Sequence, residues 1–92
     1  MENFTLKDAM DDDKFFEYAK ESAERVQISD SITRSAIRDG IFKNAGTFKK
    51  HFTEVIEKRS ELPASKRVVV KYIGMIAANK VYKRKMTADG NR

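Results

Sequence analysis

Residues 68–78 read VVVKYIGMIAA, and this stretch decides the fold because its side chains are apolar nearly all round. It is 11 residues long and contains Lys71, whereas a membrane-spanning helix needs about 20 apolar residues. Three consecutive valines lower helix propensity, so a strand over residues 67–73 is the alternative. The length of the surrounding pattern favours a helix from about Ala64 to Met86. Such a helix is either central in the fold or part of an interface.

The segment before this helix has the clearest amphipathic pattern in the chain. Apolar residues recur at spacings of i, i+4, i+7 and i+8, namely Phe48, Phe52, Val55 and Ile56. Ala45-Gly46-Thr47 is typical of a break followed by an N-cap, and Leu62-Pro63 ends the helix because proline pushes the preceding residue out of the α region.

Two further helices are expected towards the N-terminus. One begins near Asp30 or Ser31 and directs Ile32, Ala36, Ile37 and Ile41 inward. Either Asp39-Gly40 ends it, or Gly40 is tolerated at a cost of about 1 kcal/mol and the helix continues to Asn44.

The other helix covers about Asp13 to Gln27. Its core-facing stripe is Phe15, Tyr18, Ala19, Ser22 and Val26, widened by Phe16 and Ala23. Asp11, Asp12 and Asp13 stand where a helix N-terminus favours carboxylates. Residues 5–10 are expected to add one turn, because Thr5 and Asp8 have capping spacing.

Together these patterns predict an all-α fold, a compact bundle of about four helices. Residues 1–86 form a single helical domain and residues 87–92 a frayed polar tail. Gly74 and Ala78, four residues apart, either let a second chain approach to form a homodimer or accommodate a bulky neighbour in the same chain.

Charge is divided unevenly along the chain. Residues 1–46 hold 7 Lys/Arg against 10 Asp/Glu, whereas residues 47–92 hold 12 against 4, which sums to the net +5 of the whole chain. This asymmetry predicts a positive face that meets a polyanion or an acidic protein, with the acidic half turned away.

Composition argues against several other classes of protein. The chain has no cysteine, and its first residues have no basic segment followed by an apolar one, so we expect a cytoplasmic protein with no secretory signal and no membrane contact. Its single histidine, His51, is expected at the edge of an amphipathic stripe, and no serine and acid are singled out to join it in a triad. Consecutive helical residues point about 100° apart, so Asp11 to Asp13 cannot converge on one metal ion. With no glycine-rich phosphate loop either, we expect no catalytic, cofactor-binding or metal-binding residues.

Four basic clusters are the better candidates for a functional site. They are Arg34 and Arg38; Lys49 and Lys50; Lys66, Arg67 and Lys71; and Lys80, Lys83, Arg84 and Lys85. Arg34 and Arg38 lie one helical turn apart and could contact phosphate on the same side. Ion pairs with Asp30, or a solvated surface, are the structural alternative. The last cluster closes a helix, where the dipole favours one or two cations but does not require four.

The middle of the chain also has features of a helix-turn-helix. Ala36 and Gly40 have the required spacing, but Gly46 and Lys49 stand where apolar residues belong, and a longer turn would restore the pattern by placing Phe48 and Phe52 in the core.

Residues 46–52, GTFKKHF, resemble the start of the recognition helix in the tetracycline-repressor family. The resemblance covers seven of 92 residues and lacks the Ala-Gly turn that should precede it. It implies that Thr47, Lys49 and Lys50 face DNA.

Two functions therefore remain open. The first is a small basic module that binds DNA or RNA through a Lys/Arg face. The second is a protein-binding module, such as an inhibitor, adaptor or assembly subunit, that docks on an acidic or nucleic-acid-binding surface of a larger partner.

Overall fold

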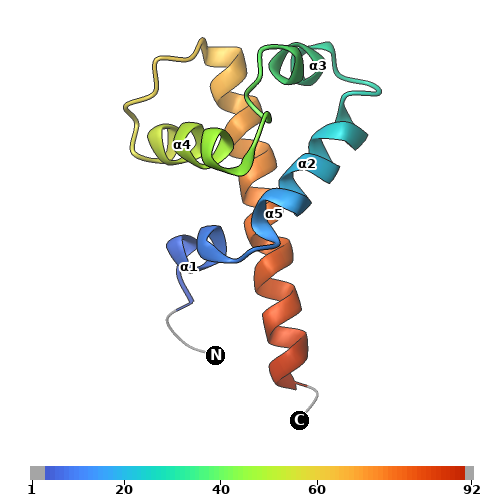
Figure 1. Ribbon diagram of the computed structural model, residues 1–92, viewed down its shortest axis with the longest axis vertical. Coiled ribbons are helices and arrows are strands. Elements are labelled where there is room, and N and C mark those ends of the chain that lie inside the picture. The colour runs from blue at the N-terminus through green and yellow to red at the C-terminus, as the bar shows by residue number, and fades with distance from the viewer. Residues whose placement is uncertain (1–3, 91–92) are drawn as a thin grey trace.

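The computed structural model describes residues 4–90, with side chains through Thr87. These residues form an all-α fold of five helices with no strand, as predicted. The helices are α1 (Leu6–Asp11), α2 (Phe15–Val26), α3 (Ser31–Arg38), α4 (Ala45–Ile56) and α5 (Ala64–Gly90). In Figure 1, α5 runs the length of the molecule, and α2 and α4 cross in front of it.

The long helix α5 is the centre of the fold and packs against each of the other four helices. The strand alternative for residues 67–73 is wrong, because Val69 and Val70 are buried within this helix. The burial of these side chains outweighs their weak helix propensity. The helix extends past Met86 to Gly90, so most of the expected polar tail continues it; Asn91 and Arg92 lie outside the described residues.

Aromatic side chains from α2 and α4 fill the core beside α5. Phe15 of α2 lies 5.7 Å from Phe52 of α4, measured between ring centroids, and Phe48 lies 6.0 Å from Phe52 in a stacked arrangement. All three rings are fully buried. The stripes predicted on α2 and α4 therefore face the core, with Val55 and Ile56 partly buried beside it.

Gly74 allows the ring of Phe52 to lie directly against α5. A Cβ atom added to Gly74 would be 2.2 Å from a ring carbon of Phe52. Because real Cβ contacts are not that short, only glycine fits here. Gly74 thus accommodates a bulky neighbour of the same chain, so its small size does not serve contact with a second chain.

Of the inward-facing residues predicted for α3, Ala36 and Ile41 are buried and Ile37 is partly buried, but Ile32 is not. Thr33 is buried in place of Ile32, which is 43% exposed. The Thr33 hydroxyl can be buried because it donates a hydrogen bond to Asp30 Oδ2 at 2.6 Å. The helix ends at Arg38 rather than Asn44, since Gly40 adopts φ +86° and the Ile41 N–H bonds to the Ala36 carbonyl, as in a Schellman motif.

The acidic residues before α2 do not form its first turn. Asp11 ends α1 and Asp12 is its C-cap, while α2 begins only at Phe15. The expected extra turn is α1 itself, and Thr5 and Asp8 form the predicted capping box. The Lys14 N–H donates to Asp12 Oδ1 at 2.8 Å, which turns the chain between the two helices.

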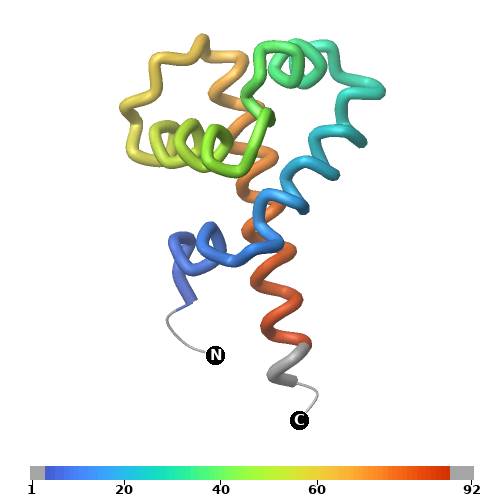
Figure 2. Tube along the Cα trace, viewed as in Figure 1, coloured from blue at the N-terminus to red at the C-terminus, as the bar shows by residue number. Residues whose placement is uncertain are grey.

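The helices form two layers. The principal extents are 43 × 29 × 18 Å, and the shortest is close to two helix diameters of about 10 Å each. The tube in Figure 2 shows α1 beside the C-terminal half of α5, with α3 and α4 at the opposite end. Within the described residues no helix combines the length and hydropathy needed to cross a membrane.

Candidate nucleic-acid interface

The C-terminal basic cluster is mostly engaged inside the chain. The Asp12 side chain is only 6% exposed, and it accepts a hydrogen bond from Arg84 Nη2 at 2.8 Å. Lys85 Nζ lies 3.4 Å from its other oxygen, and Lys80 lies over the ring of Tyr18 at 5.9 Å. Of the four predicted residues, Lys83 alone has neither an ion pair nor an aromatic partner among the described side chains. Lys80 therefore contacts α2, and Arg84 and Lys85 contact the turn before α2.

The pKa of Asp12 reflects this environment. Burial raises the pKa and is the largest single influence. The Lys14 N–H bond and the charges of Lys85 and Arg84 act in the opposite direction and together hold the pKa below its ordinary value. The carboxylate is therefore ionised at neutral pH and retains its basic partners.

Two other predicted basic residues also have internal roles. Lys66, with a side chain 14% exposed, pairs with Asp39 at the end of α3. Arg34 donates to the backbone carbonyl of Gln27 at 2.9 Å, just after α2. Arg38 is exposed and makes no ion pair within residues 4–87.

A groove at the junction of α4 and α5 has a purely basic rim. Its volume is about 450 Å³, and its lining contains three cations, one hydroxyl and no carboxylate: Val55, Lys58, Ser60, Ala64, Arg67, Val68 and Lys71. We call it the basic groove. Arg67 is fixed there because its Nη1 donates to the Leu62 carbonyl at 2.6 Å. Lys58 and Lys71 make no ion pair among the described side chains and are exposed.

Lys58, which belongs to none of the four predicted basic clusters, owes its position to the end of α4. It has a positive φ of 60°, and its N–H and that of Arg59 bond to the carbonyls of Val55 and Glu54. Glycine usually occupies this position, because other residues are strained in the left-handed region. No pattern in the sequence marks Lys58, since only the turn between α4 and α5 brings it beside Arg67 and Lys71.

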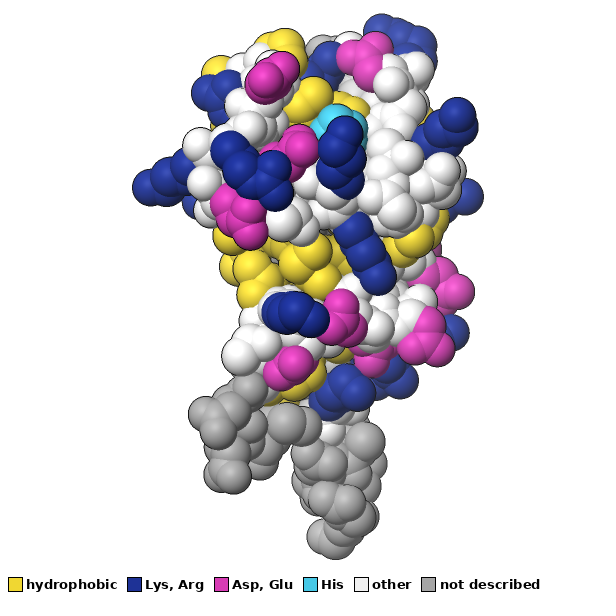
Figure 3. Space-filling model, turned by 60° about the vertical axis from the view of Figure 1, so that its left-hand side comes forward, with side chains coloured by type: hydrophobic (Ala, Val, Ile, Leu, Met, Phe, Trp, Pro, Cys, Tyr) yellow, Lys and Arg dark blue, Asp and Glu magenta, His cyan; other side chains and the backbone are white. Residues whose placement is uncertain are grey.

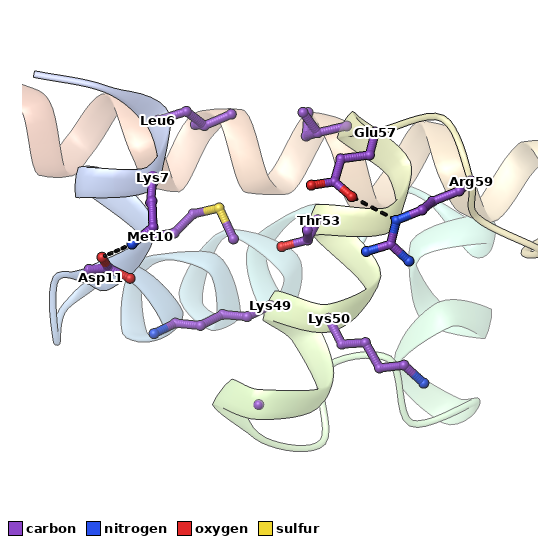
Figure 4. Close-up of a pocket in the computed structure, with 11 residues that line it drawn as sticks. Leu6, Lys7, Met10, Asp11, Lys49, Lys50, Thr53, Glu57 and Arg59 are labelled. Atoms are coloured by element: carbon purple, nitrogen blue, oxygen red, sulfur yellow. Dashed lines mark hydrogen bonds and ion pairs between the residues drawn. The ribbon is translucent and has the colours of Figure 1, made fainter.

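A second groove lies between α1 and α4 and has a volume of about 640 Å³. Its apolar lining is Leu6, Met10 and Ile56. Figure 4 shows Lys49 extending from α4 towards α1, while Lys50 points the other way. The remaining charges at its rim are paired, Lys7 with Asp11 at 3.0 Å and Arg59 with Glu57 at 2.6 Å. We call it the α1–α4 groove.

The two grooves lie on either side of the end of α4. Arg59 lines one of them and its neighbour Lys58 the other. Figure 3 shows an apolar band across this side of the molecule, with Lys and Arg side chains above and below it. Among the described residues that line the two grooves, the basic side chains without an acidic partner are Lys49, Lys50, Lys58, Arg67 and Lys71.

Helices α3 and α4 lie apart from each other. The turn between them runs from Asp39 to Asn44, and each helix packs on α5 and α2. The longer turn does place Phe48 and Phe52 in the core. In a helix-turn-helix the first helix supports the second, whereas here α5 is the main support of both. Thr47 and Lys49 are half-buried, and Lys50 is exposed.

The described residues offer no grouping of three acidic, histidine or cysteine side chains able to hold a metal ion. His51 is half-buried, and its Nδ1 has no hydrogen-bond partner among the described residues.

No protein-family model matches the chain, and comparison with curated proteins and with solved structures finds no match.

Proposed function

We propose that this protein is a small nucleic-acid-binding module that contacts phosphates through the basic groove and the adjoining lysines of α4. The observation that carries the proposal is the lining of the basic groove, where Lys58, Arg67 and Lys71 surround about 450 Å³ with no carboxylate among them. Converging cations without acidic partners are what a phosphate backbone requires, because each contact releases condensed counterions.

This assignment moves the interface away from the C-terminal cluster. Arg84 and Lys85 are engaged by Asp12, and Lys66 by Asp39. A polyanion would have to break those pairs, whereas Lys49, Lys50, Lys58 and Lys71 can meet phosphate without losing an internal contact. Because these side chains offer charge and little else, the binding tolerates most sequences.

The experiment is fluorescence anisotropy with short duplex DNA, single-stranded DNA and RNA at graded salt. The parent protein should bind with submicromolar affinity at ~50 mM salt and lose affinity steeply as salt rises. Changing Lys58 and Lys71 together to Gln should weaken binding to every sequence and flatten the salt slope by up to about two units. Changing Lys49 and Lys50 should do the same unless α4 enters a groove, in which case sequence preference would also fall.

A matched control is Lys20→Gln with Arg25→Gln, which removes the same charge from exposed positions on α2. This control should bind nearly as the parent does. Lys58→Gly is a second check, because relieving the positive φ should stabilise the fold by about 1 kcal/mol while affinity still falls. Absence of binding at ~50 mM salt, or equal losses in the control, would overturn the proposal.

A protein partner remains the second candidate, and the α1–α4 groove favours it. Leu6, Met10 and Ile56 form an apolar floor, and Lys49 and Lys50 lie at the rim. That combination suits an apolar anchor flanked by acidic residues. Thr53→Arg, which would fill this groove, should abolish capture of such a partner and leave nucleic-acid binding intact.

A further inference from the structure

The outer face of α5 carries a stripe of large apolar side chains that the fold leaves exposed. Its members are 37% to 66% exposed: Val68, Tyr72, Met75, Tyr82 and Met86. The opposite face of the same helix is fully buried against α1 to α4 through Val70, Ile73, Ala77 and Val81. The helix is therefore apolar on two opposed faces. The outer face has one recorded aromatic contact within the described chain, between Tyr82 and Phe4, whose ring centroids lie 5.6 Å apart.

The spacing along the exposed stripe is that of a coiled coil. Positions 68, 72, 75, 79, 82 and 86 are separated by four, three, four, three and four residues, which is the a and d pattern of a heptad. The one polar member is Asn79, the fourth of these six positions. A single asparagine at an a position fixes the register and number of strands in coiled coils.

We propose that α5 pairs with α5 of a second copy of this chain as a short, parallel, in-register coiled coil. Tyr72, Asn79 and Met86 occupy a positions, and Val68, Met75 and Tyr82 occupy d positions. The proposed seam shares Val68 with the lining of the basic groove, but the proposal does not depend on nucleic-acid binding.

The flanking charges favour the parallel orientation. In a parallel pair, Lys71 at g lies near Ile76 of the second copy, and Ala78 lies near Lys83, so no lysines face each other. In an antiparallel pair centred on the same stripe, Lys71 would lie opposite Lys85 at both ends. Like charges at that distance repel.

Asn79 favours the same orientation. In parallel register its amide meets the amide of its counterpart, and the two can exchange a hydrogen bond. In the antiparallel pair it would face Met75, which leaves a polar group without a partner. Val68 also borders the basic groove, so the basic grooves of the two copies would lie at the same end of a parallel dimer.

Sedimentation equilibrium at ~100 µM tests the association. The parent should have the mass of a dimer, and Tyr72→Glu with Met75→Glu should weaken the dimer at least about 100-fold, because two unpaired charges enter an apolar seam. The matched control is Ile28→Glu with Ile32→Glu, which makes the same chemical change at exposed apolar residues outside α5. Asn79→Leu should associate more tightly, and it should form oligomers of more than one size rather than a dimer alone.

Disulfide trapping tests the orientation, since the chain has no cysteine of its own. Asn79→Cys should form a disulfide-linked dimer under mild oxidation, because parallel register brings the two positions together. Lys20→Cys, exposed on α2, should not. A monomer in the parent, a dimer that survives the Tyr72 and Met75 changes, or equal trapping at Lys20 would each overturn the proposal.

Discussion

At the scale of single residues, Gly74 is the position where the packing tolerates least change. In an exposed helix, Gly→Ala would stabilise by about 1 kcal/mol. Here the added methyl group would meet the buried ring of Phe52, so Gly74→Ala should lower the free energy of unfolding by about 1 to 3 kcal/mol. Urea unfolding followed by circular dichroism measures this change.

Gly46→Ala provides the matched comparison. Gly46 is also helical, but its nearest neighbour to an added Cβ is Asn44 Oδ1 at an ordinary 3.5 Å. That substitution should stabilise the protein by about 0.5 to 1 kcal/mol. Shrinking the ring with Phe52→Leu should reduce the cost of Gly74→Ala; equal costs in both backgrounds would contradict the contact.

At the scale of helices, Asp12 connects the turn between α1 and α2 to the last part of α5. Substitutions of neighbouring basic residues on α5 should therefore have very different effects on the free energy of unfolding. Arg84→Gln should lower the free energy of unfolding by about 1 to 2 kcal/mol, because it removes a charged hydrogen bond from a nearly buried carboxylate. Lys83→Gln should stay within about 0.5 kcal/mol of the parent. Thermal and urea unfolding of the Arg84→Gln and Lys83→Gln variants measure this difference. Equal effects would mean that the contact with Asp12 adds no stability.

The helices could be predicted from the sequence because apolar periodicity is a local property. The stripes of α2 and α4, the Thr5 capping box and the break before Pro63 all depend on residues within a few positions of each other. The burial of Thr33 in place of Ile32 could not be predicted. It depends on whether Thr33 finds an acceptor, and the Asp30 side chain supplies one.

The candidate site was harder to predict, because charge in the sequence does not show which cations are already paired. Lys66, Arg84 and Lys85 find acidic partners 27 to 73 positions away. Arg67 and Lys71 were selected, but Lys58 was missed, since only the turn from Glu57 to Pro63 brings it to the same groove. Pairing over such separations is set by the tertiary fold.

At the scale of the whole molecule, the charge asymmetry of the sequence is partly cancelled within the fold. Asp12 and Asp39 of the acidic half are paired with α5, so the acidic residues are not simply turned away from the basic half. Among the described side chains, Lys49, Lys50 and Lys58 on or just after α4, and Lys71 on α5, have no acidic partner. Net charge alone would have placed the interface at the C-terminus, where most of the cations are already paired.

The stability of the molecule should fall in acid, and Asp12 should account for much of that loss. The pKa values of Asp12 and Asp30 are both held below 3.8 in the folded chain, the first by the Lys14 N–H bond and by Lys85 and Arg84 against the effect of burial, the second mainly by the Thr33 hydroxyl. A lowered folded pKa means that the unfolded chain takes up protons first. The stabilisation is therefore complete above pH 3.8 and lost as pH falls through the folded values.

Urea unfolding of the parent and of Asp12→Asn between pH 7 and pH 2 measures this contribution. At pH 7 the variant should be less stable, because Arg84 and Lys85 lose their charged partner. As pH falls through the lowered pKa of folded Asp12 the two proteins should converge, since protonated Asp12 is as uncharged as asparagine. Asp13→Asn removes the same charge at an exposed neighbour and should stay within about 0.5 kcal/mol of the parent at pH 7. A stability difference between the parent and Asp12→Asn that stays constant to pH 2 would show that the Asp12 carboxylate is not favoured by folding.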